Sequence, residues 1–267
     1  MSYRGRIAPT PTGYLHLGHA RTFWIAQQRA RENNGTLLYR NENLDPQRCK
    51  PEFRETTIED LRWLGLEWEG EPLDQSDRML EYRTAFEQLR TAGHLFPCAC
   101  SRKDIREAST APHSEDGEPI YPGTCRDIPT SPNPQPSTDL NWRLRVPEGE
   151  PVTFTDGRCG EQTFMAGQDF GDFPVWQKNG LPSYQLAVVV DDAATGITEV
   201  VRGEDLLVST VRQILLYRAL GLEQPAFYHC ELMRDENGER LAKRHDALSL
   251  RELRAEGKTP EDLRAKF

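Results

Sequence analysis

The chain opens with Arg6-Ile7-Ala8-Pro9-Thr10-Pro11-Thr12-Gly13 and continues, two residues later, with His16-Leu17-Gly18-His19. Ile7 and Ala8 predict a short apolar strand, and the prolines with the glycine predict a tight turn after it. An apolar pattern with helical spacing then runs through residues 17–33. The predicted order is therefore strand, loop and helix, the unit from which parallel α/β sheets are built.

Two imidazoles lie in the first turn of the predicted helix. His16 and His19 are three residues apart, so they share one helix face. The unpaired backbone N–H groups and the dipole of a helix N-terminus favour an anion at this end. Gly18 carries no Cβ and lets a flat ligand approach the backbone. These features are typical of a polyphosphate site, although a histidine pair of this kind can also be incidental.

A second basic element lies far downstream, in Glu239-Arg240-Leu241-Ala242-Lys243-Arg244 after Gly238. A basic loop of this type can close over phosphates, and it can equally be a solvated turn. Together the histidine pair and the basic loop are more specific than either part.

Composition sets the broad class. A chain of 267 residues can form one large α/β domain with a small inserted or appended one. It has no apolar run long enough to cross a bilayer and no secretory signal pattern at its N-terminus, so we expect a cytoplasmic protein. The net charge of −9 argues against broad nonspecific nucleic-acid binding and still allows a local basic strip for tRNA. The six cysteines are expected to be thiols or metal ligands.

The composition and the predicted secondary structure of the chain change twice. Strand-like and helix-like segments alternate up to residue 95, which predicts a parallel, doubly wound sheet. Residues 109–138 are rich in Pro, Ser, Thr, Gly and Asp and predict loops. Short strands are predicted at 141–146 and 151–156, in a small antiparallel unit. Alternating strand-like and helix-like segments resume near residue 182, so an insertion of about 80 residues is expected to split one nucleotide-binding fold.

The quoted motifs resemble a known family. His16 to His19 is similar to the HIGH signature of class I aminoacyl-tRNA synthetases, and residues 240–244 are similar to a degenerate KMSKS loop, with Ala242 where a serine is common. RIAPTPTG, RNENLDPQR, SYQLAVVVDD and VVRGEDLL together resemble glutamyl-tRNA synthetases. The resemblance covers nearly the whole chain, but a full glutamyl-tRNA synthetase continues into an anticodon-binding domain that we expect to be absent here.

The resemblance therefore favours a truncated paralogue within that family. Such an enzyme activates L-glutamate with ATP without needing tRNA, and it attaches glutamate to the queuosine base in the anticodon of tRNA(Asp). It also implies a Rossmann-like fold of four parts: residues 1–95, a zinc-containing acceptor-type insertion at 96–181, a second catalytic half at 182–233, and a KMSKS-like loop with a helical stem at 234–267. A monomer without membrane contact is expected.

For residues 183–192 propensity and resemblance disagree. The run Val188-Val189-Val190 favours a strand, whereas the resemblance implies a helix with Ser183 as its possible N-cap. We follow the resemblance. Residues 249–267 are charged and helical in character.

The implied reaction needs cations and N–H donors at ATP. A substrate carboxylate is already an anion, so positioning and charge stabilisation at phosphorus must carry the rate. The resemblance gives this work to His16, His19 and Lys243, with Gly18 in the ATP site and Mg²⁺ accompanying ATP. Lys243 is expected to contact the pyrophosphate, because a charge on a flexible stem suits a closing loop.

A pocket for glutamate needs arginine forks for two carboxylates and an anion for the ammonium. The resemblance implies that it is formed by Arg6, Ala8, Thr10, Glu42, Tyr184 and Arg202. Glu42 would receive the ammonium, and Tyr184 would supply a hydroxyl and a flat wall. Which arginine takes which carboxylate stays open.

A further constellation is Cys98-x-Cys100 with Cys125. Three thiolates suit zinc, which prefers four soft ligands in a tetrahedral array. The resemblance suggests the Tyr121 oxygen as the fourth ligand, and His94 and His113 compete with it. Zinc would staple a loop-rich insertion. Three unliganded thiols are the alternative.

Three other functions stay open at this point. The chain could be the catalytic fragment of a conventional glutamyl-tRNA synthetase. It could be an HxGH nucleotidyltransferase, which would leave the predicted glutamate pocket without a purpose. It could also be a tRNA-binding or amino-acid-sensing module without activity.

Overall fold

The structure is a computed structural model that describes residues 2–101, 103–105, 120–127, 140–233 and 249–267. Its first half is a parallel sheet of β1 (Arg4–Ile7), β2 (Thr36–Asn41) and β3 (Leu73–Asp74), in that order. Helix α1 (Leu17–Glu32) connects β1 to β2, and α2 (Pro51–Trp63) lies between β2 and β3. The predicted strand, loop and helix at the start of the chain are confirmed.

The second half repeats the pattern. Strands β9 (Glu199–Gly203) and β10 (Ala226–Cys230) pair in parallel, with α6 (Leu207–Leu220) between them and α5 (Tyr184–Ala194) before them. The N–H of Thr198 donates to the carbonyl of Arg4 at 2.9 Å, which places β9 beside β1. The predicted parallel sheet is confirmed, and both halves end their strands at the same edge.

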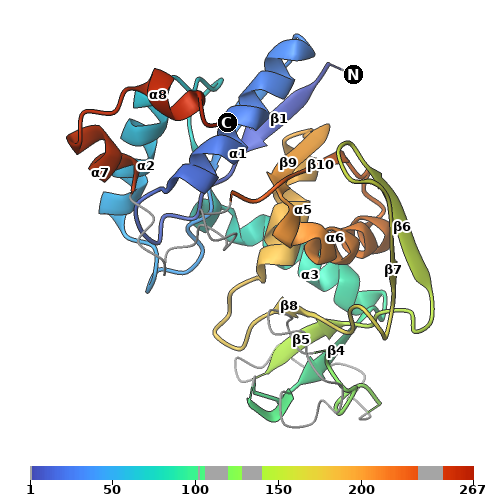
Figure 1. Ribbon diagram of the computed structural model, residues 1–267. Coiled ribbons are helices and arrows are strands. Elements are labelled where there is room, and N and C mark those ends of the chain that lie inside the picture. Colours follow the sequence, from blue (N-terminus) through green and yellow to red (C-terminus); the bar gives the residue numbers. More distant parts are fainter. Residues whose placement is uncertain (1, 102, 106–119, 128–139, 234–248) are drawn as a thin grey trace.

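The middle of the chain forms two units. Strands β4 (Leu95–Cys98), β5 (Asn141–Leu144) and β8 (Pro174–Trp176) make a three-stranded antiparallel sheet. The hairpin of β6 (Pro151–Asp156) and β7 (Gly160–Met165) lies instead beside β10, with β6 parallel to it (Figure 1).

The expectation that 141–146 and 151–156 share one antiparallel unit is therefore wrong. Every second residue of β6 is buried, and the Phe154 ring lies 5.7 Å from that of Phe227 on β10. This apolar face joins the hairpin to the second half of the fold.

Residues 184–194 form a helix, as the resemblance implied and against the strand propensity of their valines. The hydroxyl of Ser183 accepts the N–H of Leu186 at 3.4 Å and caps it. Val188 and Val189 are completely buried, and burial within the core outweighs the weak propensity of β-branched residues for strands.

The remaining elements frame this core. They are η1 (Gln75–Arg78), α3 (Met79–Thr91), η2 (Glu204–Leu206), α7 (Leu250–Ala255) and α8 (Pro260–Arg264). Capping boxes at Ser249 and Thr259 start α7 and α8, which confirms the helical character predicted for the last residues. Both lie near α2 (Figure 1). Within the described ranges, no helix has the length and apolar character that a membrane span requires.

Candidate active site

One pocket opens above the carboxyl ends of β1 and β9, beside the N-terminus of α1. Its walls include most of the side chains predicted for ATP and glutamate: Arg6, Ala8, His16, Gly18, His19, Glu42, Tyr184 and Arg202. These residues come from segments up to 196 positions apart (Arg6 to Arg202). Other wall residues were not predicted from the sequence, among them Phe23, Asp205 and the segment 231–233.

The two histidines stack on each other at the start of α1. Their ring centroids lie 3.8 Å apart with 30° between the planes. A Cβ at Gly18 would meet the His16 ring at 3.2 Å, so glycine leaves room for that ring as well as for a ligand. His16 is the N-cap of the helix, which places both imidazoles at the positive end of its dipole.

Lys243 and the rest of the basic loop lie outside the described residues. The chain on both sides of that loop is nonetheless at the pocket. Residues 231–233 line it before the loop, and after the loop Ser249 forms an antiparallel bridge with His16. The N–H of Leu250 also donates to the carbonyl of Leu15 at 2.8 Å.

The two pocket arginines differ in how their charge is compensated. Arg6 is 5% exposed, its Nε lies 3.4 Å from Asp192, and its Nη1 donates to the carbonyl of Val201 at 3.1 Å. Arg202 is equally buried, yet it forms no ion pair with any carboxylate of the described chain; its Nη1 lies 3.5 Å from the Tyr184 hydroxyl. Burial lowers the pKa of Arg202. A buried guanidinium without a counter-ion is a site prepared for an anion.

Glu42 supplies the negative charge of the pocket. Its Oε1 accepts from Arg40 Nη2 at 3.1 Å, and its Oε2 accepts from the hydroxyl of Thr10 at 3.4 Å. Burial raises the pKa of Glu42, and the guanidiniums of Arg40 and Arg6 oppose that rise. Thr10 thus contacts Glu42 through its hydroxyl and is not among the residues that line the pocket.

Sequence reasoning missed a buried charge network behind the pocket. Arg40 Nη1 donates to Asp192 at 2.5 Å, so Asp192 faces both Arg40 and Arg6. The neighbouring Asp191 accepts from Arg78 at 2.6 Å and from the Tyr82 hydroxyl at 2.8 Å. Two adjacent acids at the end of the apolar run 186–190 were the available signal, because charges in such a run need buried partners.

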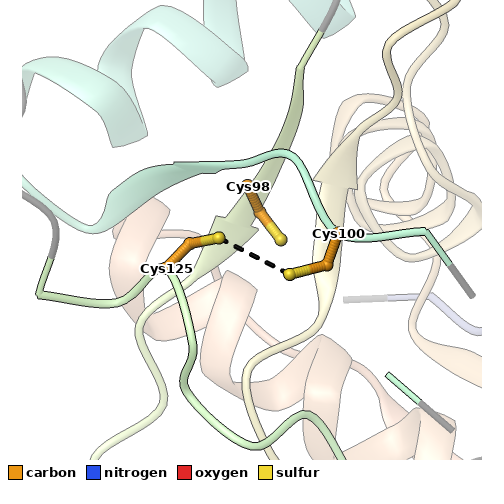
Figure 2. A group of neighbouring side chains, drawn as sticks. All are labelled: Cys98, Cys100 and Cys125. Carbon is orange, nitrogen blue, oxygen red and sulfur yellow. Dashed lines mark hydrogen bonds between the residues drawn. The ribbon is translucent and has the colours of Figure 1, made fainter. Parts of the chain in front are cut away.

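The predicted metal ligands converge at the end of β4. The sulfurs of Cys98, Cys100 and Cys125 lie within 4.8 Å of one another and turn toward one another (Figure 2). The hydroxyl of Tyr121 is 3.4 Å from the Cys98 sulfur and 3.9 Å from the Cys100 sulfur. All six cysteines are free, and the three in the cluster form a candidate metal centre. His94 is not part of this group, and His113 lies outside the described residues.

Fold and pocket together define an enzyme of the class I tRNA synthetase type. Residues 2–267 match the family described as tRNA synthetases class I (E and Q), catalytic domain. The chain is also similar to a crystal structure of a glutamate tRNA ligase from Elizabethkingia meningosepticum in complex with its amino acid, with a TM-score of 0.73 and 25% identity. The match covers 91% of this chain and 52% of that one, so the chain spans about half the length of that ligase.

Curated relatives narrow the family. A glutamyl-Q tRNA(Asp) synthetase of Nitratidesulfovibrio vulgaris is 45% identical over 95% of this chain and 82% of its own length. Another from Rhodobacter capsulatus is 41% identical over 97% of both chains. The chain therefore belongs to the class I aminoacyl-tRNA synthetase family, in the group of the glutamyl-Q tRNA(Asp) synthetases.

Proposed function

We propose that this enzyme activates L-glutamate with ATP, without tRNA, and transfers the glutamate to the queuosine base in the anticodon of tRNA(Asp). The observation that carries the first step is the pocket itself. Two buried arginines and one buried carboxylate line the same cavity as the two stacked histidines. A dicarboxylate with one ammonium complements these charges, beside a site for a polyphosphate.

The chemistry follows from the charges. An oxygen of the glutamate α-carboxylate attacks the α-phosphorus of ATP, the bond to the bridging oxygen breaks, and pyrophosphate leaves with that electron pair. The nucleophile needs no general base, because it is already ionised. His16 and His19 stabilise the charge that develops on the phosphate oxygens, and Lys243 holds the leaving pyrophosphate. Mg²⁺, bound with ATP, neutralises phosphate charge.

Substrate choice rests on the opposite wall. Arg6 and Arg202 hold the carboxylates of glutamate, Glu42 accepts from its ammonium, and Tyr184 supplies a hydroxyl and a flat wall. The small side chain of Ala8 leaves room in the pocket for the substrate, and Thr10 orients Glu42 through its hydrogen bond. Glutamine has the same shape but offers a neutral amide to a buried guanidinium, so it is disfavoured.

The acceptor is inferred from the relatives, whose names specify queuosine tRNA(Asp) chemistry. The test is transfer of labelled glutamate to tRNA(Asp) with and without queuosine. Label on the queuosine-containing tRNA alone is expected. Label on both would favour conventional glutamylation of the terminal adenosine. ATP–pyrophosphate exchange that needs a phosphorylated small molecule instead of L-glutamate would favour a nucleotidyltransferase, and no exchange at all would favour a non-catalytic module.

We propose zinc for the cysteine cluster, because the donors fit it. A tetrahedral ion with Zn–S bonds near 2.3 Å separates its sulfurs by about 3.8 Å. Cys100 and Cys125 sulfurs are 3.5 Å apart, and the Tyr121 oxygen completes the set at comparable distances. Arg143 Nε donates to the Cys98 sulfur at 3.3 Å, a cation that favours thiolates. Zinc would join β4 to the segment around residue 125.

Zinc content tests this centre. The double variant Cys98→Ser/Cys100→Ser is expected to lose about one zinc per chain, since two hydroxyls are poor ligands for this ion. Burial and the neighbouring thiols raise the pKa of Cys100 to about 11, so metal binding must release protons and weakens as the pH falls. Metal analysis of purified protein measures the zinc content of the variant and, for protein equilibrated at different pH values, the loss of zinc as the pH falls. Cys159→Ser is the matched control, and full zinc in the double variant would show that these are not the ligands.

The basic loop has its own test. Lys243→Ala is expected to lower glutamate-dependent ATP–pyrophosphate exchange about a hundredfold or more, because it removes a cation from a transition state with growing charge. Glutamate binding, measured by calorimetry, is expected to persist. Lys258→Ala, an exposed lysine after the loop, is the control. Native exchange in Lys243→Ala would remove this lysine from the mechanism.

We also propose the division of the chain into four parts at residues 95, 181 and 233, which the family resemblance implies. We propose that the enzyme is a monomer. The positions of residues 231–233 and Ser249 at the pocket support a boundary near residue 233.

A further inference from the structure

Three buried side chains lie behind Arg202 and have no part in the proposed mechanism: His229, Asp156 and Thr210. Arg202 Nε lies 3.3 Å from Nε2 of His229, and Nδ1 of His229 lies 2.7 Å from Oδ2 of Asp156. His229 and Thr210 are completely buried, and Asp156 is 2% exposed. None of these three lines the pocket, so none can touch the substrate.

The protons of this chain can be assigned. Oxygens of Asp156 also accept the backbone N–H groups of Arg158, Cys159 and His229, so the carboxylate acts as an acceptor throughout. Nδ1 of His229 must therefore carry the proton, which leaves Nε2 as an acceptor that faces the Nε–H of Arg202 at 3.3 Å and the hydroxyl of Thr210 at 2.9 Å. Burial and the nearby Arg202 lower the pKa of His229 to about 4, which keeps the imidazole neutral.

The arrangement holds the guanidinium without cancelling its charge. Thr210 Oγ1 accepts from Nη2 of Arg202 at 2.6 Å, so Nε and Nη2 both have neutral acceptors. Nη1 is left beside Tyr184 at the pocket. A carboxylate in place of His229 would bind Arg202 as an ion pair and compete with an anionic ligand. Here the carboxylate lies one imidazole farther away.

We propose that Asp156 is a positioning residue for substrate choice: through the tautomer of His229 it orients Arg202 and leaves its charge available for a carboxylate of the substrate. This inference rests on the proposed glutamate activation and deepens it. Asp156 ends β6, so the hairpin that pairs with β10 connects the middle of the chain to the pocket.

The test is Asp156→Asn in the full-length protein. The backbone N–H groups of Arg158 and Cys159 both donate to Oδ1, so they favour the Asn oxygen at that position, which turns its NH₂ toward Nδ1 of His229. Nδ1 must then accept, the ring proton moves to Nε2, and Arg202 Nε–H loses its acceptor. We expect the KM for L-glutamate in ATP–pyrophosphate exchange to rise about tenfold, with kcat and the KM for ATP within about threefold of native values. The preference for glutamate over glutamine falls with it.

Two further variants separate positioning from structure. His229→Gln places an amide oxygen near the position of Nε2 and is expected to keep more glutamate affinity than His229→Leu. Asp169→Asn is the matched control, because its carboxylate accepts the N–H of Met165 at 2.6 Å beside the same hairpin and touches no pocket residue. Circular dichroism verifies that each variant is folded.

The outcomes are distinct. A native KM for glutamate in folded Asp156→Asn, or an equal loss of kcat and of both affinities, would overturn the positioning role while the native enzyme still exchanges with glutamate. Absence of glutamate-dependent exchange in the native protein would instead overturn the proposed function.

Discussion

Replacing Arg202 by leucine is expected to raise the KM for L-glutamate at least about a hundredfold, the largest effect on activity that we anticipate from a single binding residue. The guanidinium is 5% exposed and has no carboxylate partner in the described chain, so the substrate is its expected counter-ion. Removing one member of a buried charge pair costs about 3 kcal/mol or more, which corresponds to that factor. Initial rates of ATP–pyrophosphate exchange over a range of glutamate concentrations measure it.

Two companion variants sharpen this result. Arg202→Lys retains the charge but loses the planar fork, so an intermediate KM is expected. Arg218→Leu removes an exposed arginine from α6, the helix that follows the strand of Arg202, and should leave the KM unchanged. If Arg202→Leu bound glutamate as the native protein does, the carboxylate site would have to lie elsewhere in the pocket.

The largest effect on stability is expected at Asp192. Asp192→Asn removes a fully buried charge that faces both Arg40, at 2.5 Å, and Arg6, at 3.4 Å. Arg40 then keeps Glu42 and Asp191 as partners, whereas Arg6 loses the one ion pair that it forms among the described residues, and the free energy of unfolding should fall by about 3 kcal/mol. For a chain of this size that lowers the thermal midpoint by about 6–12 °C, which calorimetry or circular dichroism measures.

An exposed ion pair gives the contrast. Glu59→Gln removes the carboxylate that faces Arg251 and Arg254 on α7, where both partners are about half exposed. Water screens such a pair, so the expected change is within about 0.5 kcal/mol. A thermal midpoint for Asp192→Asn as close to native as that of Glu59→Gln would mean that the Asp192 charge is not needed to hold the arginines.

Predictions from the sequence succeeded where the interacting residues are close together along the chain. The strand–loop–helix unit at the start, the helical last residues and the paired histidines of α1 all depend on neighbours within a few positions, and these predictions are confirmed. Helix α5 was found only through the resemblance, because three successive valines favour a strand by themselves.

Predictions failed or were absent where partners are far apart in the chain. The position of β6 beside β10 depends on Phe154 meeting Phe227, and no local pattern records that contact. Asp156 and His229 are 73 residues apart, and Arg40 and Asp192 are 152 apart. The hydrogen bond from the Thr10 hydroxyl to Glu42, 32 residues away, was likewise not predicted.

The sequence by itself determined the parallel α/β class, the pair of histidines at the start of α1 and the identities of three converging thiols, because these depend on residue type and local spacing. Only the tertiary structure decided which charges are cancelled and which remain available. Arg6 and Arg202 look alike in the sequence, but packing gives Arg6 a carboxylate and Arg202 a neutral imidazole. The physical reason is that the electrostatic interaction between a buried charge and a ligand depends on every group packed around the charge. Only folding brings those groups together.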